Sequence, residues 1–310
     1  MPLPRVAIPT GDPAGIGPEI AYKAALDPAV REICTPVLFS DTVVLRSHGG
    51  DPDRVLVSIV PFEGSLQIGK IAADHGRAII ACAQSAVRAA LAGAFDAVVA
   101  APHTEAAIHA AGIAFDGYPS FVAKLCGLPP EDGILMLCFE HQGREVRIAH
   151  VTLHAGVAKA LALITKERIL KTLRAVHAVL GNPKIAVSGV NPHAGEGGAF
   201  GTEEIEIIAP AIEQARGEGI DAEGPIGADT LIQRRGFDAY VVMLHDQGHV
   251  AAKLLAPQRV AGLTIGTPVL FSSVAHGSAL DIAGQGRADP AAMVEAITRL
   301  VARRRRAPAT

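Results

Sequence analysis

The sequence contains no tryptophan, only three tyrosines and few charged residues, which make up 19% of its 310 residues. Hydrophobic residues make up 49%. This balance excludes a disordered or fibrous chain and predicts a globular protein with a sizeable core. At this length the core belongs either to one large domain or to two lobes.

Neither sign of charge dominates, and long apolar runs are absent. The net charge of −3 provides no overall attraction to nucleic acid or to an anionic membrane. The first ten residues do not read as a signal peptide, and no apolar run is long enough to span a bilayer. The one basic run, Arg303–Arg306, is interpreted as a solvated, frayed helix end. We therefore expect no nucleic-acid partner and no membrane partner.

Cysteine is also scarce. The four cysteines, Cys34, Cys82, Cys126 and Cys138, are scattered and form no C-x-x-C pair. This pattern argues against a disulfide framework or a zinc knuckle, and it predicts reduced, mostly buried thiols in a cytoplasmic protein.

Short β-branched runs alternate with longer segments of helical periodicity, which predicts a layered α/β architecture. The expected strands are Arg5–Pro9, Asp96–Ala101, Ile134–Phe139, Val146–Thr152, Lys184–Val190, Asp238–Leu244 and Gly262–Gly266. The expected helices are about Pro18–Leu26, Lys70–Leu91, Lys166–Leu180, Glu203–Glu213 and Pro290–Arg303.

A glycine-rich loop, Gly11–Glu19, directly follows the first expected strand. It lacks the G-x-G-x-x-G spacing and the acidic residue of a Rossmann dinucleotide site, so any NAD-binding fold here is not Rossmann. A tight turn into a helix explains the loop equally well, with Pro18 at the first helical position. Two other glycine-rich connections, Asn191–Gly201 and Ala283–Gly286, are too short to be domain linkers and are interpreted as functional loops.

Three of the twelve histidines follow expected strands: His154, His193 and His245. Ligands of open parallel sheets bind beyond the carboxyl ends of strands, and imidazoles suit zinc or another borderline divalent metal with an open position. A structural role is the commoner outcome for any one histidine, but the shared placement of three favours a metal site. Four others are expected at the surface: His48, His75, His141 and His177.

Two residues near His245 are candidates for proton transfer. Asp246 could orient a histidine or act as a base, and Lys253 could carry a proton if it were buried beside a metal. A solvated helix position is the plain alternative for Lys253. Residues 275–286, AHGSALDIAGQG, combine close backbone approach with polar side chains, which suits an adenine and ribose site. A capped helix start would explain that segment equally well.

Several motifs, in order along nearly the whole chain, resemble the 4-hydroxythreonine-4-phosphate dehydrogenase (PdxA) family. They are GDPAGIGPEI at 11–20, NPHAGEGG at 191–198, GADT at 227–230, HDQG at 245–248 and HGSALDIAGQGRAD at 276–289. The glycine loop and the HGSALDIAG stretch are also similar to those of isocitrate and isopropylmalate dehydrogenases.

The resemblance implies an isocitrate/isopropylmalate dehydrogenase-like, three-layer α/β fold with two lobes around a cleft, one spanning about 1–125 plus 260–310 and the other about 126–259. It also implies a homodimer with each site completed across the interface, and a small-molecule substrate. His154, His193 and His245 would bind a divalent metal: zinc is favoured, with Mg, Mn, Co or Fe as alternatives. Asp229, Asp246 and Lys253 would be catalytic. NAD would contact the loop through His276, Gly277, Ser278, Asp281 and Gly284.

The sequence departs from the family where phosphate would bind. The phosphate-substrate enzymes carry a His-Thr pair in a G-H-T-E segment, whereas this chain has Gly117-Tyr118-Pro119-Ser120. The positions of their substrate-binding Asn and Arg hold Gly262 and Phe271. A phosphate dianion would lose several charge-assisted hydrogen bonds, each worth on the order of 1.5–3 kcal/mol. Tyr118, Pro119, Gly262 and Phe271 are therefore expected to wall a flatter, less charged pocket, although both aromatic rings could simply pack in the core.

One subgroup of the family has these features: the terephthalate cis-dihydrodiol dehydrogenases, which are enzymes of aromatic catabolism. Residues 102–120 resemble the corresponding stretch of these enzymes. The resemblance implies metal-dependent, NAD-linked oxidative decarboxylation of 1,2-dihydroxy-3,5-cyclohexadiene-1,4-dicarboxylate to protocatechuate and carbon dioxide. His103, Thr104 and Arg147 are candidates for holding the distal carboxylate. A dehydrogenase of 4-hydroxythreonine 4-phosphate or a related phosphorylated sugar acid is the alternative. A metal hydrolase is a weaker one, and a non-catalytic binding protein the weakest.

Overall fold

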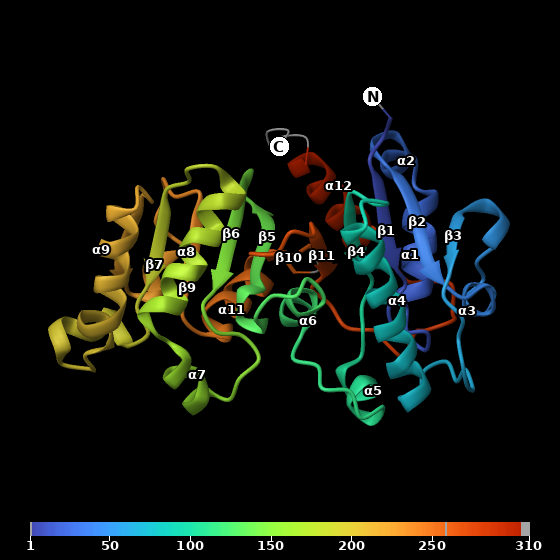
Figure 1. The fold of residues 1–310 in the computed structure, drawn as a ribbon, viewed down its shortest axis with the longest axis horizontal. Helices are drawn as coiled ribbons and strands as arrows, with labels where there is room; N and C mark the ends of the chain where they lie inside the picture. The colour runs from blue at the N-terminus through green and yellow to red at the C-terminus, as the bar shows by residue number, and fades with distance from the viewer. Residues whose placement is uncertain (1, 258, 305–310) are drawn as a thin grey trace. The chain divides into compact units, whose positions relative to one another are not determined.

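The computed structural model describes residues 2–257 and 259–304. Contacts divide the chain into two compact units: unit 1 comprises Met1–Gly127 and Pro268–Thr310, and unit 2 comprises Leu128–Thr267. Each unit is an α/β structure in which helices cover a sheet, so the expected fold class is confirmed (Figure 1). Unit 1 therefore combines two separate stretches of the chain, and β11 (Phe271–Val274), from the second stretch, pairs with a strand of the sheet that begins at Arg5.

The sheet of unit 1 is entirely parallel, with strand order β3-β2-β1-β4-β11. β1 and β4 are almost fully buried, which explains their continuous apolar sequences. The strands are β1 (Arg5–Pro9), β2 (Thr35–Ser40), β3 (Leu56–Ile59), β4 (Ala97–Ala100) and β11 (Phe271–Val274).

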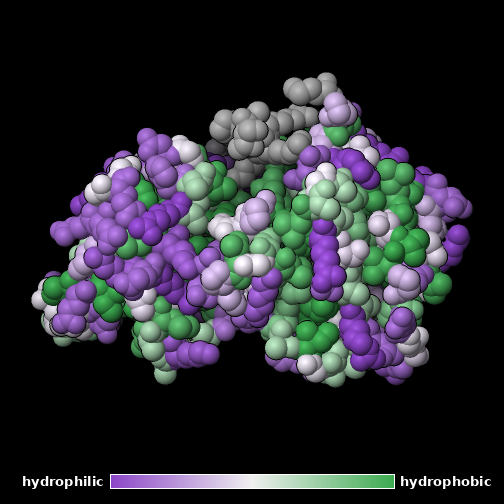
Figure 2. Space-filling view, in the orientation of Figure 1, coloured by the Kyte–Doolittle hydropathy of each residue, from purple (hydrophilic) through white to green (hydrophobic). Residues whose placement is uncertain are grey.

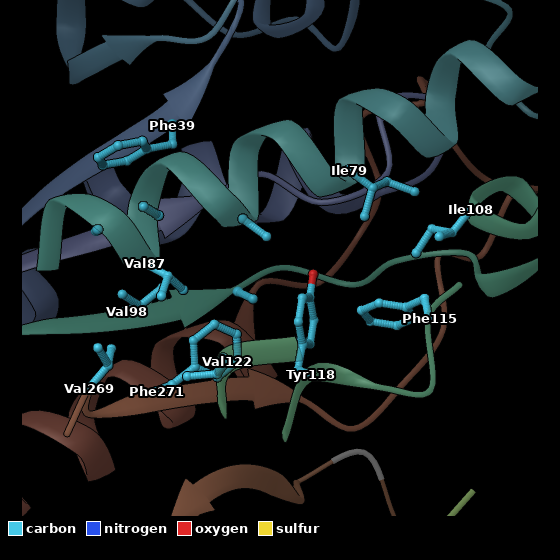
Figure 3. Close-up of a cluster of buried hydrophobic side chains, with 14 of the residues drawn as sticks. Phe39, Ile79, Val87, Val98, Ile108, Phe115, Tyr118, Val122, Val269 and Phe271 are labelled. Carbon is cyan, nitrogen blue, oxygen red and sulfur yellow. The ribbon is translucent and has the colours of Figure 1, made fainter. Parts of the chain in front are cut away.

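Helices pack on both faces of this sheet, which gives unit 1 three layers. α1 (Gly17–Leu26), α2 (Pro28–Ile33) and α12 (Ala291–Arg304) contact one another and the sheet, whereas α4 (Ala73–Leu91) contacts β1, β2 and β4 together with α5 (Glu105–Ala110) and α6 (Tyr118–Leu125). The remaining helices are α3 (Thr42–Ser47) and the 3-10 turn η1 (Pro52–Arg54). A cluster of buried hydrophobic side chains that includes several aromatic rings lies between the sheet and the α4 layer (Figure 3).

The sheet of unit 2 is mixed, with strand order β10-β5-β6-β9-β7-β8. β5 pairs antiparallel with both β10 and β6, and the pairs β6–β9, β9–β7 and β7–β8 are parallel. β10 belongs to unit 2 because of its pairing with β5. The strands are β5 (Ile134–His141), β6 (Arg144–His150), β7 (Ile185–Ser188), β8 (Ala222–Ile226), β9 (Ala239–Val242) and β10 (Ala261–Ile265).

The two faces of this sheet carry different helices. α8 (Lys166–Leu180) and α9 (Ala209–Gly217) contact β10, β6, β9 or β8, and α11 (His245–Leu255) contacts β5, β6 and β9. α8 buries Ile169, Leu170 and Leu173, while the surface over α8 and α9 is largely hydrophilic (Figure 2). The other helical segments are η2 (Pro130–Asp132), α7 (Val157–Leu163), η3 (Pro192–Gly198), the π-helix η4 (Glu204–Ile208) and α10 (Ala228–Leu231).

The expected strands and helices are present, with small shifts at their ends. The helix expected over Glu203–Glu213 instead begins as the π-helix η4 and continues as α9. The expectation of surface positions is wrong for His48 and His75, which are 6% and 0% exposed. Each ring donates one hydrogen bond inside the protein: His48 Nε2 donates to Pro13 O at 2.8 Å, and His75 Nδ1 donates to Lys70 O at 2.9 Å.

All four cysteines are free thiols, and Cys34, Cys82 and Cys138 are buried, as expected. Burial raises the pKa of Cys34 to about 11 and that of Cys82 to about 12. Over the described ranges, no helix is both long and apolar enough to cross a membrane. The basic run lies largely outside the described residues, although α12 includes the backbone of Arg303 and Arg304.

Candidate active site

The three histidines expected to bind metal follow three neighbouring strands of unit 2. His154 lies four residues after β6, His245 begins α11 shortly after β9, and His193 lies in η3 after β7. β6, β9 and β7 are adjacent and parallel, so their carboxyl ends share one edge of the sheet. Ligand sites of parallel sheets occupy that edge.

The imidazole of His245 is oriented by its neighbour in sequence, Asp246. Its Nδ1 lies 2.7 Å from Asp246 Oδ1. Because a carboxylate only accepts, the ring proton belongs on Nδ1 and the lone pair on Nε2. Metal-binding histidines usually show this arrangement, with one nitrogen on a carboxylate or carbonyl. The ring of His154 is 5.7 Å from that of His245, so these two imidazoles are near neighbours.

Two further histidines lie beside His245. The His249 ring stacks on it, with 3.7 Å between centroids, and His150 lies 4.8 Å from His249. Burial, reinforced by the neighbouring imidazoles, lowers the pKa of His249 to about 4 and that of His150 to about 3. His150 packs against the backbone of Gly248, where any side chain would overlap its Nε2. Both rings are therefore neutral near pH 7 and place no positive charge behind His245.

His193 lies on a left-handed turn rather than on regular helix. Residues 193–197 all have positive φ, including His193 at 50° and Ala194 at 55°. α10 contacts this turn, and a Cβ at Gly227 would lie 2.7 Å from Asp229 Oδ1 and 3.5 Å from the Cα of His193. Asp229 and His193 therefore flank the same glycine, and the Asp229 side chain is exposed.

The donor set suits a divalent cation, although the geometry is not that of a closed site. Three imidazoles and nearby carboxylates are ligands that zinc accepts. Within residues 2–257 and 259–304, no three or more His, Cys, Asp or Glu side chains lie close enough together to hold a metal ion. Lys253 is exposed on α11, two turns beyond His245, so the burial considered from the sequence is absent in this structure.

The segment expected to bind NAD docks on the first glycine-rich loop within unit 1. Ile16 N donates to Ser278 O at 2.8 Å, and a Cβ at Gly15 would lie only 2.6 Å from Ser278 Cβ. Thr104 Oγ1 bonds to Ser278 Oγ at 2.9 Å and also donates to the buried carboxylate of Asp12. Gly15 therefore has a packing role besides its place in the turn, because only a residue without a side chain lets the loop at 11–19 contact the segment at Ser278.

The far end of the same segment is attached to α1. Lys23 Nζ donates to Gly286 O at 3.0 Å and Ala288 O at 2.8 Å, and Glu19 Oε1 accepts from Lys23 at 2.7 Å and from Ala288 N at 2.8 Å. Between these anchors Asp281 and Gly284 are exposed, and directly before the first anchor Gly277 is exposed and His276 is half-buried. An exposed loop fixed at both ends is suited to binding a ligand on its outer side.

The aromatic residues expected at the pocket wall are core residues of unit 1. Phe271 is 0% exposed and Tyr118 is 4% exposed, with 5.0 Å between their ring centroids. Figure 3 shows the Tyr118 ring between Phe115 and Phe271, with its hydroxyl pointing toward α4. That hydroxyl has no hydrogen-bond partner among the described residues, and burial raises its pKa. This arrangement matches the core-packing alternative; Pro119 and Gly262 are also buried.

The three side chains considered for a distal carboxylate have other partners. Arg147 forms an ion pair with Glu145 and donates to Asp238 O at 3.1 Å. Thr104 belongs to the Asp12–Ser278 network, and His103 packs its ring against Tyr118 at 4.6 Å.

Several residues of the site were not identified from the sequence. His249 follows His245 by four residues, a helical spacing that could have revealed the stacked pair. Glu204, Gln247 and Asp12 give no such signal, because their partners are distant in sequence or lie on the backbone.

The chain belongs to the PdxA family: residues 25–300 match the family described as "Pyridoxal phosphate biosynthetic protein PdxA". A 1,2-dihydroxy-3,5-cyclohexadiene-1,4-dicarboxylate dehydrogenase from a Comamonas species is 42% identical over 308 residues, covering 96% of each chain.

Solved structures show the same relationship. A terephthalate 1,2-cis-dihydrodiol dehydrogenase from Burkholderia xenovorans is 39% identical, with a TM-score of 0.68, covering 96% of this chain and 98% of that one. A 4-hydroxythreonine-4-phosphate dehydrogenase from Klebsiella pneumoniae is 30% identical, with a TM-score of 0.82, covering 97% and 98%. An isocitrate dehydrogenase from Methylococcus capsulatus, 18% identical with a TM-score of 0.56 over 97% and 85%, shares the fold.

Proposed function

We propose that this protein is a divalent-metal-dependent, NAD-linked decarboxylating dehydrogenase. Its proposed substrate is 1,2-dihydroxy-3,5-cyclohexadiene-1,4-dicarboxylate, and its products are protocatechuate and carbon dioxide. The observation that carries the substrate is the segment 117–120, where buried Tyr118 and Pro119 occupy the positions at which phosphate-substrate relatives carry a His-Thr pair. The 42% identical Comamonas dehydrogenase supports the same choice.

The reaction balances without a further co-reactant. The secondary carbinol carbon gives a hydride to NAD while a base takes the proton of its hydroxyl, which leaves a ketone. The carboxylate on the neighbouring carbon then leaves as carbon dioxide, its bonding electrons form the enolate, and the proton returns to the enolate oxygen as the ring becomes aromatic. When bound, the cation supplies Lewis-acid polarisation of the substrate oxygens. His154, His193 and His245 would bind it, and Asp246 would hold His245 with its proton on Nδ1.

Other residues of the chain would position the nucleotide and move protons. The loop from His276 to Gly284 would contact NAD on its exposed side, fixed by Thr104 and Lys23 at its two ends. Lys253 would exchange protons with the substrate, and Asp229 would lie beside the His193 turn. Phe271 and Tyr118 would act indirectly on the choice of substrate. Their buried rings fill space beneath the pocket, and they provide no side chain that could bind a phosphate.

We also propose that zinc is the preferred cation, that the protein works in the cytoplasm, and that it acts as a homodimer whose partner completes each site. Sedimentation gives the oligomeric state directly, and a monomer at working concentration would contradict the dimer.

The proposed substrate is tested by following NADH formation with the dihydrodiol and, separately, with 4-hydroxythreonine 4-phosphate. Turnover of the dihydrodiol that stops after chelation and returns with zinc is the expected result. Turnover of the phosphate compound alone would favour the second candidate, which the likeness to the Klebsiella enzyme supports. Hydrolysis without NAD reduction would place the protein among metal hydrolases.

The ligand assignment is tested with His193→Ala, which should abolish metal binding and turnover while the protein stays folded. His109→Ala replaces an exposed histidine of unit 1 and should leave both unchanged. Wild-type metal stoichiometry in His193→Ala would overturn the assignment.

A further inference from the structure

The turn that carries His193 has an unusual backbone. His193, Ala194 and Glu196 adopt φ values of 50°, 55° and 43°, with Gly195 and Gly197 between them also at positive φ. Left-handed φ is unfavourable for residues with a Cβ, and a run of such residues persists only where its surroundings hold it. The sequence of the turn alone does not explain this conformation, so the cause lies in its contacts.

The carboxylate of Glu204 provides those contacts. Glu204 is only 2% exposed, and its Oε1 accepts hydrogen bonds from Val190 N at 2.7 Å and Asn191 N at 2.8 Å. Its Oε2 accepts from Asn191 Nδ2 at 2.9 Å. A buried charged group is therefore satisfied by the segment that leads into His193, and charge-assisted hydrogen bonds of this kind are the stronger ones.

Close packing shows that the carboxylate lies against the turn on both sides of His193. A Cβ at Gly189 would lie 2.8 Å from Glu204 Oε1, and a Cβ at Gly195 would lie 2.8 Å from Oε2. Glu204 also begins the π-helix η4, and wide helical turns of this kind occur frequently at functional sites. The carboxylate of Glu204 therefore starts from a helical turn of a kind common at functional sites, and it packs directly against the His193 turn.

The same network reaches the segments that carry the other two histidines. Gln247 Nε2 donates to Gly189 O at 3.1 Å, while Gln247 Oε1 accepts from Met243 N at 2.9 Å and Leu244 N at 3.0 Å, directly before His245. Thr152 Oγ1 donates to Met243 O at 2.7 Å, two residues before His154. Hydrogen bonds therefore link all three segments within unit 2.

We infer that Glu204 is a positioning residue of the metal site: its buried carboxylate holds the left-handed turn that presents His193. It acts on the backbone of the turn and contacts neither metal nor substrate. This inference rests on the proposed role of His193 as a metal ligand.

The matched pair of variants is Glu204→Gln and Glu203→Gln. Both remove one negative charge, and Glu203 also accepts a hydrogen bond from Asn191 Nδ2, at 2.6 Å. Of the two, Glu204 is the one that accepts hydrogen bonds from the backbone N–H groups of Val190 and Asn191, which lead into the turn. A glutamine at 204 would place an amide donor against the Asn191 donor or against a backbone N–H, so at least one of these hydrogen bonds is lost.

Two measurements are made on each variant: zinc affinity of the metal-free protein, by competition with a chromophoric chelator, and amide hydrogen exchange of the metal-free protein over residues 189–198. Glu204→Gln should weaken zinc binding by about tenfold or more, as loss of an outer contact to a metal site commonly does. It should also speed exchange in that segment. Glu203→Gln should resemble the wild type in both.

The outcomes separate this inference from the proposed function. If His193→Ala loses zinc binding but Glu204→Gln matches the wild type in affinity and exchange, the positioning role is overturned and the ligand assignment stands. If His193→Ala keeps zinc binding, the ligand assignment fails and the role of Glu204 in metal binding fails with it. Should Glu204→Gln not fold, Glu204→Asp keeps the carboxylate but withdraws it by one methylene from the N–H groups of Val190 and Asn191, and unchanged zinc affinity and exchange there would overturn the inference.

Discussion

His245 and His249 lie one turn apart on α11, and their imidazole rings stack with 3.7 Å between centroids and 7° between planes. His249 Nδ1 donates to His245 O at 3.1 Å, which fixes the second ring over the first. A neutral, stacked neighbour restricts the rotation of His245 without repelling a cation. His249 is therefore expected to hold His245 in the orientation that Asp246 also favours.

Replacement of His249 by Ala removes the stack and should weaken zinc binding by about two- to tenfold, since such ring pairs are worth roughly 0.5–1.5 kcal/mol. Phenylalanine preserves a ring on the same face, so His249→Phe should bind zinc nearly as well as the wild type. Chelator competition on the metal-free proteins measures both. Equal losses in the two variants would show that the imidazole nitrogen, rather than the stacked ring, is what matters.

The sequence predicts those parts of this protein that local patterns determine. Buried β1 has an unbroken apolar run, and α8 has one apolar face, so the bounds of both could be predicted directly. The placement of His154, His193 and His245 after parallel strands follows from the same patterns.

Other features depend on contacts that no local pattern records. The His193 turn is shaped by Glu204, from a separate helical segment, and Ser278 meets Gly15 from the opposite end of the chain. The sequence around an aromatic residue looks the same whether its ring packs in a core or lines a pocket. The sequence therefore could not decide between these two placements for Phe271. His75 illustrates the same limit, because two backbone groups satisfy its buried ring.

Truncation of Phe271 distinguishes a core residue from a pocket wall. Phe271 is fully buried among Tyr118 and other apolar side chains, so Phe271→Ala should destabilise the protein by about 3–5 kcal/mol through lost burial and a cavity. Tyr118→Phe is the matched control: it keeps the ring and removes an unpaired buried hydroxyl, so stability should stay equal or rise. Denaturant unfolding gives both values. A small stability loss in Phe271→Ala combined with a large rise in KM would instead support a pocket wall.

The contact between Gly15 and Ser278 predicts that a single methyl group disrupts the proposed NAD site. A Cβ at position 15 would lie 2.6 Å from Ser278 Cβ and 2.7 Å from Ser278 O, too close for the loops to stay docked. Gly15→Ala should therefore weaken NAD binding, measured by calorimetry, and destabilise the protein by about 1–3 kcal/mol. Gly217→Ala, at a helix end where no atom lies within 4 Å, is the control and should change neither. If Gly15→Ala bound NAD as tightly as the wild type, NAD binding would not depend on the contact between Gly15 and Ser278, and the prediction would be wrong.

Buried His48 makes stability depend on pH. Its Nε2 donates to Pro13 O at 2.8 Å, and its Nδ1 has no hydrogen-bond partner among the described residues. Burial lowers the pKa of His48 below its ordinary value of 6.5, so the unfolded chain takes up this proton at a higher pH than the folded protein does. The neutral ring is therefore fully compatible with the fold above about pH 6.5, and stability falls as pH decreases below that value.

The expected size is at most about 1.4 kcal/mol per pH unit for this one group. His48→Gln keeps a donor for Pro13 but cannot take up the proton, so its free energy of unfolding should fall less between about pH 7.5 and about pH 5.5 than that of the wild type. His150 and His249 titrate equally in both proteins, which leaves the difference to His48. Denaturant unfolding at the two pH values measures it, and parallel losses in the two proteins would show that His48 is not protonated on unfolding in this range.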